Sequence, residues 1–287
     1  EDSVAQIAGD NRIRQAYLRE SLLRYSREVA FAAAEVFAGA AESRGAWDAR
    51  LQDLILDAIV TNEAEHAIES RALAARWHID QPVIALVGPV PHNRVAIEVH
   101  IEQIRRTART LHFEVLIGVQ STRMIVIIGA TSSESLTSDA LKQFLHHFGP
   151  GTVVMGPIVD NLRLAHQTLA PALSGYSSSP LTPTSERLVH ATDLTAARVL
   201  SGDTDAIAPL IQLISDELRD DVRETLAAYL EHSPSIEGCA RQLFVHVNTV
   251  RYRLKRVAEV TGLDPLDPQD ALTLRLALML RRKAQSL

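Results

Sequence analysis

The hydrophobic period of the chain changes twice along its length, and this change constrains the fold more than any other feature. Up to residue 78, apolar residues recur every three or four positions with charged residues between them, as in amphipathic helices. Short β-branched runs then alternate with helical segments over residues 82–192. From residue 193 the helical period returns. We therefore predict a multidomain chain, with an α/β middle domain between an all-α N-terminal bundle and an all-α C-terminal domain.

The middle segment has a definite order of elements. The runs PVIALVGPV, FEVLIGVQ, MIVIIGA and GTVVMG indicate strands, and STR between the second and third indicates a hairpin. Helical patterns occupy residues 93–111, 138–148 and 159–173. The order β-α-β-β-α-β predicts a ferredoxin-like domain with helices on one face of the sheet. The Ser- and Pro-rich stretch 174–185 predicts a loop, after which RLVHAT adds one further strand.

Composition and charge exclude several classes of protein. The single cysteine, Cys239, excludes a disulfide framework and any site with several thiolates, and it fits a reducing compartment. No apolar run approaches the ~20 residues of a membrane-spanning helix, so we expect no membrane partner. The whole chain has a formal charge of −6, yet residues 241–283 hold nine Lys and Arg against four Asp and Glu. Such asymmetry favours an anion-binding C-terminal segment on an acidic body.

The C-terminal segment predicts two short helices joined by a tight turn. Ser235 is a suitable N-cap for IEGCARQLF, and NTVRYRLKRVAEV follows after a turn at 245–247. The second helix has an apolar stripe made of Val247, Val250, Leu254 and Val257. Four basic residues lie off this stripe: Arg251, Arg253, Lys255 and Arg256. This pattern is typical of a helix-turn-helix, whose second helix enters the major groove of DNA. A closing helix from about 268 to 283 would complete its core with four leucines, Leu274, Leu276, Leu278 and Leu280.

Residues 226–264, LAAYLEHSPSIEGCARQLFVHVNTVRYRLKRVAEVTGLD, resemble the C-terminal DNA-binding domain of the PucR/CdaR family of bacterial transcription regulators. The family pattern AYLEH…ARxLxVHxNTVRYRLxRIxExTG matches at residues 228–232, 240–241, 245–246, 248–254, 256, 259, 261 and 262. Val247 departs from the family, which often has a polar residue there. The resemblance also implies a degenerate GGDEF-like middle domain. The N-terminal helices resemble the helical sensor-like domain of some members, which is similar to the N-terminal part of stress co-antagonist proteins.

The resemblance implies a cytoplasmic, sequence-specific transcription regulator that binds double-stranded DNA. It implies eight DNA-binding residues: His246, Asn248, Thr249, Arg251, Tyr252, Arg253, Lys255 and Arg256. For Asn248 and Thr249, a purely helix-capping role is the alternative. A single helix-turn-helix buries little DNA surface, so we expect a homodimer or a higher homo-oligomer on a repeated operator. The signal would enter through the N-terminal and middle domains, from an effector that the sequence does not identify.

No cofactor, metal site or catalytic centre is predicted. The hairpin GVQSTRM has neither the Gly pair nor the carboxylate that a working diguanylate cyclase needs to hold Mg²⁺. Glu63 and His66 have the spacing of carboxylate-bridged metal bundles, but the lack of a second pair favours a surface charge cluster. The adjacent His146 and His147 diverge on a helix and cannot easily share a metal. Cys239 and the two tryptophans, Trp47 and Trp77, are expected in apolar cores.

We expect four segments along the chain. They are an N-terminal helical domain at 1–80, a degenerate GGDEF-like domain at 81–193, a helical connector at 194–221 and a helix-turn-helix domain at 222–287. Two other functions stay open. One is a signalling scaffold that binds a protein partner through the N-terminal helices, and the other is a nucleotide-binding sensor with little DNA binding. Salt-dependent binding to duplex DNA would separate both from a regulator.

Overall fold

A computed structural model of the chain describes residues 20–22, 24–26, 50–91, 94–182, 185–214, 218–231 and 235–285. The chain divides into two compact units, residues 1–54 and residues 55–287. The described residues of the first unit are all helical. Most of the predicted N-terminal bundle, including Trp47, lies outside the described residues. Within the described ranges, no helix combines the length and the apolar character needed to cross a membrane.

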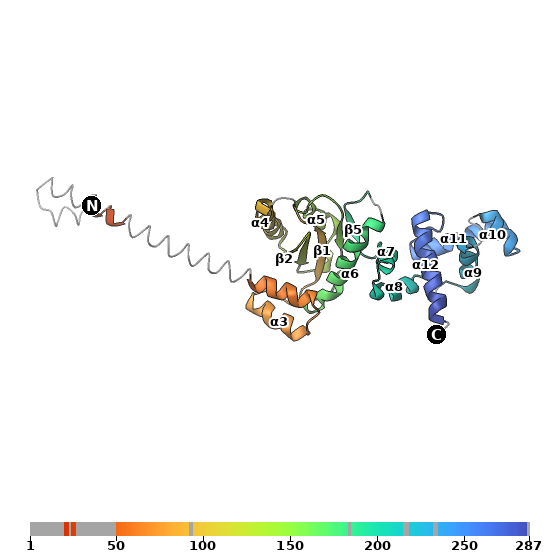
Figure 1. Cartoon of the computed structure of the whole chain (residues 1–287), viewed down its shortest axis with the longest axis horizontal. Helices are drawn as coiled ribbons and strands as arrows, with labels where there is room; N and C mark the ends of the chain where they lie inside the picture. Colours follow the sequence, from red (N-terminus) through yellow and green to blue (C-terminus); the bar gives the residue numbers. More distant parts are fainter. Residues whose placement is uncertain are drawn as a thin grey trace, which may run out of the picture. The chain divides into compact units, whose positions relative to one another are not determined.

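A five-stranded mixed sheet forms the centre of the middle part (Figure 1). The strand order is β2-β3-β1-β4-β5; β4 and β5 are parallel, and all other neighbours are antiparallel. The strands are β1 (Val83–Pro89), β2 (Glu114–Gln120), β3 (Arg123–Gly129), β4 (Val153–Met155) and β5 (Leu188–His190). Each of the five runs that the sequence indicates as a strand therefore forms one.

Strands β2 and β3 form the predicted hairpin. Its turn consists of Ser121 and Thr122, because Gln120 already pairs with Arg123 in the ladder. Ser121 has a φ of 56°, the left-handed conformation that a two-residue hairpin turn requires at its first position. The predicted connection STR is thus one residue too long.

Helices cover both faces of the sheet (Figure 1). On one face, residues 55–60 of a helix, α3 (Glu65–Ala74) and α6 (Ala165–Ser178) pack against Val83, Ala85 and Val87 of β1. On the other face, α4 (Arg94–Leu111) and α5 (Ser138–Lys142) pack against Ile84 and Leu86. The prediction of helices on one face only was wrong. Strands β1 and β3 are apolar at almost every position, and such a run must be buried on both sides.

Two predicted boundaries in the middle part also differ from the structure. Helix α6 continues to Ser178 and into a short 3₁₀ turn, η4 (Ser179–Leu181), where the sequence predicts a loop from residue 174. The hydroxyls of Ser177 and Ser178 donate to carbonyl oxygens one turn back, at 3.0 and 2.9 Å, so these serines satisfy their polar groups inside the helix. The single helix predicted at 138–148 is divided into α5 and a 3₁₀ turn, η2 (Leu145–His147).

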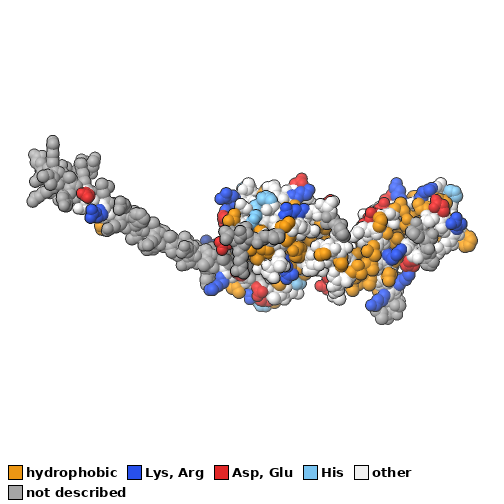
Figure 2. All heavy atoms as spheres, turned by 45° about the horizontal axis from the view of Figure 1, so that its top comes forward, with side chains coloured by type: hydrophobic (Ala, Val, Ile, Leu, Met, Phe, Trp, Pro, Cys, Tyr) orange, Lys and Arg blue, Asp and Glu red, His pale blue; other side chains and the backbone are white. Residues whose placement is uncertain are grey.

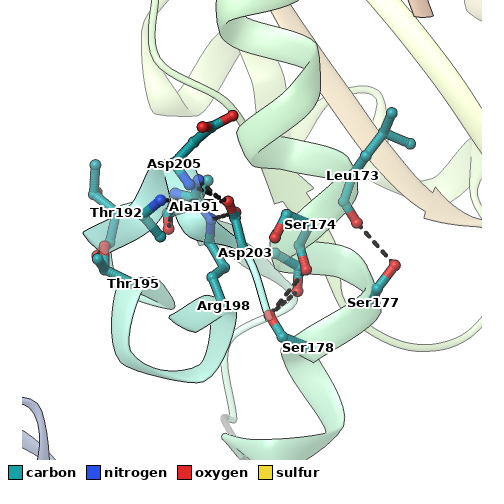
Figure 3. A network of polar contacts seen from close by, with 12 residues as sticks. Leu173, Ser174, Ser177, Ser178, Ala191, Thr192, Thr195, Arg198, Asp203 and Asp205 are labelled. Atoms are coloured by element: carbon teal, nitrogen blue, oxygen red, sulfur yellow. Dashed lines mark hydrogen bonds and ion pairs between the residues drawn. The ribbon is translucent and has the colours of Figure 1, made fainter. Parts of the chain in front are cut away.

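A buried ion pair stabilises the segment that follows β5 (Figure 3). Nε and Nη2 of Arg198, on α7 (Thr195–Leu200), both lie 2.9 Å from Oδ2 of Asp203, and the two side chains are 8% and 15% exposed. Asp203 also caps η5 (Thr204–Ala206) by accepting two backbone N–H groups. Burial by itself would raise the pKa of Asp203, but hydrogen bonds from Ser174 and Arg198 and the charge of Arg198 lower it. One carboxylate therefore joins α6, α7 and η5.

The C-terminal helices share one apolar core. They are α8 (Ile207–Gln212), α9 (Asp220–Glu231), α10 (Ile236–Gln242), α11 (Val247–Thr261) and α12 (Pro268–Gln285). Leu210, Ile214 and Leu218 contribute to this core together with residues of α9–α12. Leu274 and Leu278 of α12 are buried in it, while Leu276 and Leu280 pack at its margin. The predicted closing helix and its role in the core are confirmed.

Candidate nucleic-acid interface

Helices α10 and α11 are joined by a tight turn with a regular hydrogen-bond pattern. The Ser235 hydroxyl caps α10 by accepting the backbone N–H of Gly238 at 3.0 Å, as predicted. At the other end, the N–H of Phe244 donates to the Arg241 carbonyl and the N–H of Val245 to the Ala240 carbonyl, at 3.4 and 3.1 Å. These two bonds form a Schellman motif, which places Phe244 in the left-handed conformation with a φ of 53°. Helix α10 therefore ends abruptly, and four residues separate it from α11.

The first residues of α11 have distinct roles. Nδ1 of His246 accepts the backbone N–H of Asn248 at 3.1 Å, so His246 is the N-cap of α11. The cap that the sequence leaves open to Asn248 or Thr249 is thus supplied by His246. The side-chain oxygen of Asn248 instead accepts a hydrogen bond from Nη1 of Arg251 at 3.2 Å, and Asn248 is exposed. Its amide lies on the outer surface of the helix and is not used for capping.

The inner face of α11 is the apolar stripe that the sequence predicts. Val250, Leu254 and Val257 are buried, and Val247 is half-buried at the edge of the same core. Cys239 of α10 is completely buried in this core, and burial raises the pKa of its thiol. The thiol therefore stays protonated and packs as a core residue, as expected.

The outer face of α11 presents polar and basic side chains to solvent. Tyr252 is 70% exposed and the Lys255 side chain 77% exposed. Arg256 lies 3.1 Å from Glu259, with more than half of its side chain exposed. Arg251 lies 4.0 Å from Glu237 of α10 and is similarly exposed. Exposed ion pairs of this kind contribute little, about 0–1 kcal/mol, so these cations can exchange their partners for phosphates at low cost.

Arg253 differs from the other basic residues of α11. Its Nη1 donates to the Thr225 hydroxyl at 3.0 Å and its Nη2 lies 3.0 Å from Oδ2 of Asp221, both on α9. Only 18% of the side chain is exposed. The prediction that Arg253 contacts DNA stays untested, but the structure places its guanidinium against α9, where it connects two helices of the domain.

Two surface features near α11 have no counterpart in the sequence analysis. Phe244 is 96% exposed. A hollow of about 420 Å³ lies beside α11, and its lining is mostly apolar: Ile236, Leu254, Ala258 and Leu266, with Arg251, Lys255 and Asp264. Figure 2 shows that, on the face it presents, Lys and Arg side chains are spread over the C-terminal helices among apolar and acidic ones. Neither feature has a sequence signal, because both depend on how the turn and the loop after α11 fold back.

The described residues of the middle part show neither a carboxylate at the hairpin turn nor a group of side chains placed to hold a metal ion. The hairpin turn carries no carboxylate, and Arg123 at its base donates to the Gln120 side chain at 3.0 Å. Among the described residues, no group of three or more His, Cys, Asp or Glu is placed to hold a metal ion. Glu63 forms an ion pair with Arg71 at 2.9 Å. This contact agrees with the surface charge cluster that the spacing of Glu63 and His66 favours.

The geometry of α10, the turn and α11 defines a helix-turn-helix protein, with a buried apolar inner face and an exposed basic outer face on the second helix. Comparison with family models agrees with this. Residues 222–280 match the PucR C-terminal helix-turn-helix domain, and residues 61–175 match the GGDEF-like domain. The resemblance to PucR-type regulators is thereby confirmed: the chain carries a PucR-type helix-turn-helix domain preceded by a GGDEF-like domain.

Two of the similar proteins described below are named as regulators. The chain is 38% identical over 269 residues to an uncharacterized protein of Mycobacterium tuberculosis, covering 91% of this chain and 64% of that protein. It is 26% identical over 263 residues to the carbohydrate diacid regulator of Escherichia coli, covering 82% of this chain and 66% of the regulator. The crystal structure of a regulator of polyketide synthase expression from Bifidobacterium adolescentis superposes with a TM-score of 0.73 at 27% identity, covering 82% of this chain and 93% of that one. The chain thus spans about two thirds of the length of the mycobacterial protein and of the Escherichia coli regulator.

Proposed function

We propose that the protein is a sequence-specific transcription regulator that binds double-stranded DNA through α11, in the bacterial cytoplasm where the chromosome lies. The observation that carries this proposal is the outer face of α11. It offers exposed cations and the exposed amide of Asn248 on a helix whose inner face is anchored in an apolar core. The relatives named as regulators support the same function.

The residues of α11 divide into two groups by their surroundings. Arg251, Lys255 and Arg256 are exposed and extend along the helix, which suits contacts with phosphates. His246, Asn248, Thr249 and Tyr252 lie in the first two turns, which are nearest the bases when a recognition helix docks. Asn248 is the best candidate for a base contact, since an exposed amide can pair with adenine through two hydrogen bonds. Arg253 would hold α11 against α9.

The proposed domain division is the one expected from the sequence: 1–80, 81–193, 194–221 and 222–287. The order β2-β3-β1-β4 with antiparallel neighbours supports a ferredoxin-like middle domain, because a β-α-β-β-α-β chain of that fold produces this order. Residues 55–79, before the first boundary, contribute to the core on one face of this sheet. The N-terminal and middle domains would receive a signal from a small molecule or a protein, and the active form would be a homodimer or a higher oligomer.

The middle domain is proposed to have no cyclase activity. A hairpin turn made of Ser121 and Thr122, with Gln120 and Arg123 beside it, has no carboxylate to bind Mg²⁺. Incubation of the purified protein with GTP or ATP and Mg²⁺ should therefore yield no cyclic product. Turnover that substitutions in residues 118–124 abolish would contradict this part of the proposal.

Binding to DNA selected from a random pool tests the proposed function directly. The full chain should bind the selected duplex more tightly than a scrambled one, and both affinities should fall with salt. Asn248→Ala should cost about 1–3 kcal/mol on the selected duplex and little on the scrambled one. Its melting temperature should hardly change, because His246 supplies the cap. His246→Ala is the matched control, and it should lower the melting temperature through loss of that cap.

Three results would contradict the proposal in different ways. Absence of salt-dependent binding to any duplex would favour the scaffold that uses its N-terminal helices. Tight binding of GTP without DNA binding would favour the nucleotide sensor. An unchanged preference for the selected duplex in Asn248→Ala, together with a lower melting temperature, would show that Asn248 is structural.

A further inference from the structure

We propose that Phe244, in the turn between α10 and α11, contacts DNA by packing its ring against the 5-methyl group of a thymine at the edge of the site. This inference rests on the proposed function of α11 as the recognition helix. Phe244 is 96% exposed, the largest exposed fraction of any large hydrophobic side chain in the part of the chain that the structure describes. Its ring contributes to none of the apolar cores.

The backbone at this position does not favour phenylalanine either. A φ of 53° is a left-handed conformation, which is unfavourable for a bulky side chain and which glycine or asparagine adopts more easily. Among the described residues, four other non-glycine residues have a positive φ, and all of them are polar: Asn62, Arg76, His112 and Ser121. Phe244 thus has an unfavourable backbone conformation and no burial in the free protein. A contact made in a complex would account for its ring.

The turn holds Phe244 in a fixed place. The two Schellman hydrogen bonds constrain its backbone on both sides, and Val245, the next residue, packs against the apolar core. Phe244 precedes His246, the N-cap of α11, by two residues. This is the end of a recognition helix that lies closest to the bases. The ring is therefore presented in a defined position at the DNA-facing end of the motif.

The surroundings of the ring favour DNA over a protein partner. The exposed residues near it in the sequence are polar or basic: Arg241, Gln242, His246 and Asn248. A protein interface is built around a buried apolar core, and one ring among polar groups is too small for such a core. The major groove instead offers single apolar points, the thymine methyl groups, and phenylalanine is one of the side chains that contact them.

Three substitutions at residue 244 separate the ring from the backbone conformation. Phe244→Asn removes the ring and relieves the left-handed strain, Phe244→Ala removes the ring and keeps most of the strain, and Phe244→Tyr keeps the ring. Each variant is tested in the full chain on the duplex selected by the wild-type protein. In parallel, each thymine of the site is replaced by uracil, which removes only the 5-methyl group.

The wild-type protein should lose about 4-fold in affinity at one particular thymine-to-uracil change, the equivalent of one buried methyl group. Phe244→Asn and Phe244→Ala should bind the parent duplex more weakly by at least that factor and should be insensitive to the same uracil change. Phe244→Tyr should behave like the wild type. Phe244→Asn should also melt at a higher temperature than Phe244→Ala, so that its weaker binding is not caused by misfolding.

Two outcomes would overturn the inference and leave the proposed function intact. One is an Asn variant that keeps full affinity for the parent duplex. The other is a loss of affinity that is the same with thymine and with uracil at every position, since the ring would then act elsewhere. If an Asn variant with full affinity for DNA lost gene regulation in cells, the ring would instead contact a protein partner. If the wild-type protein bound no duplex at all, the proposed function itself would fail.

Discussion

Replacing Arg253 with methionine should destabilise the C-terminal domain and leave its phosphate contacts unchanged. The guanidinium lies 3.0 Å from both the Thr225 hydroxyl and the Asp221 carboxylate, with 18% of the Arg253 side chain and 33% of the Asp221 side chain exposed. Removal of one partner of a fully buried pair costs about 3–5 kcal/mol. Water can still reach Asp221, so we expect about 1–3 kcal/mol, the range for a hydrogen bond to a charged group. In a domain of this size, such a loss lowers the melting temperature on the order of 10 °C.

Two measurements on the same variants separate this structural role from phosphate binding. One is the melting temperature, and the other is the dissociation constant for a fixed duplex at several salt concentrations, at a temperature where all variants are folded. Arg251→Ala and Arg256→Ala should melt close to the wild type, because their ion pairs are exposed. Each should flatten the salt dependence by about one charge, equivalent to roughly 3.5-fold in affinity between 50 and 200 mM salt. Arg253→Met should melt at a lower temperature than the wild type, and its affinity for DNA should depend on salt with the wild-type slope.

Ser235→Ala serves as the control, because it removes the cap of α10 without changing any charge. It should cost about 1 kcal/mol in stability and leave the salt slope unchanged. If Arg253→Met instead melted with the wild type and flattened the salt slope by one charge, Arg253 would be a phosphate contact. The assignment of its guanidinium to α9 would then be wrong.

Two further predictions concern pH. Burial and the neighbouring His146 and His100 lower the pKa of His147 to about 4, and its Nε2 lies 3.1 Å from the Thr107 hydroxyl. The unfolded chain takes up a proton on His147 near pH 6.5, whereas the folded protein takes it up only near pH 4. The free energy of unfolding should therefore decrease as the pH is lowered from 6.5 to 4, and melting curves of His147→Phe should lack this dependence. The pKa of Asp203 is lowered in the folded protein, so its carboxylate stabilises the fold above about pH 3.8 and the benefit is lost below. Asp203→Asn should melt well below the wild type at pH 7, and the difference should shrink as the pH is lowered below about 3.8, whereas a constant difference at all pH values would contradict a role of the charge.

The elements that sequence patterns predicted correctly are those defined by local spacing. Strands β1 and β3 are short and β-branched, and the inner face of α11 repeats at helical intervals, so neighbouring residues were sufficient to identify them. The sequence predicts helices on one face of the sheet only, because the apolar run of a strand does not show which helices will pack on it. The end of α6 was missed because serine and proline indicate a loop, while Ser177 and Ser178 bond back to their own helix.

In the candidate site, the basic character of α11 was predictable, but the roles of single residues depend on distant contacts. The partners of Arg253 lie on α9, and no spacing in the sequence connects them. Histidine is not among the preferred N-cap residues, so the sequence favours Asn248 or Thr249 as the cap, whereas in the structure the cap is His246. The exposure of Phe244 follows from the conformation of one turn.

The shared core of α8 and the C-terminal helices determines where this protein can be divided. Leu210, Ile214 and Leu218 lie before residue 222, where the match to the helix-turn-helix domain begins, and Arg281 of α12 donates to the Ile214 carbonyl at 2.5 Å. A fragment that starts at 222 would expose the apolar surface that these residues cover, and it would tend to aggregate. A chimera joined at that residue would inherit the same defect. The smallest piece that keeps both this core and the Arg198–Asp203 pair begins at α7, and exchanges of DNA specificity between related chains should be made there.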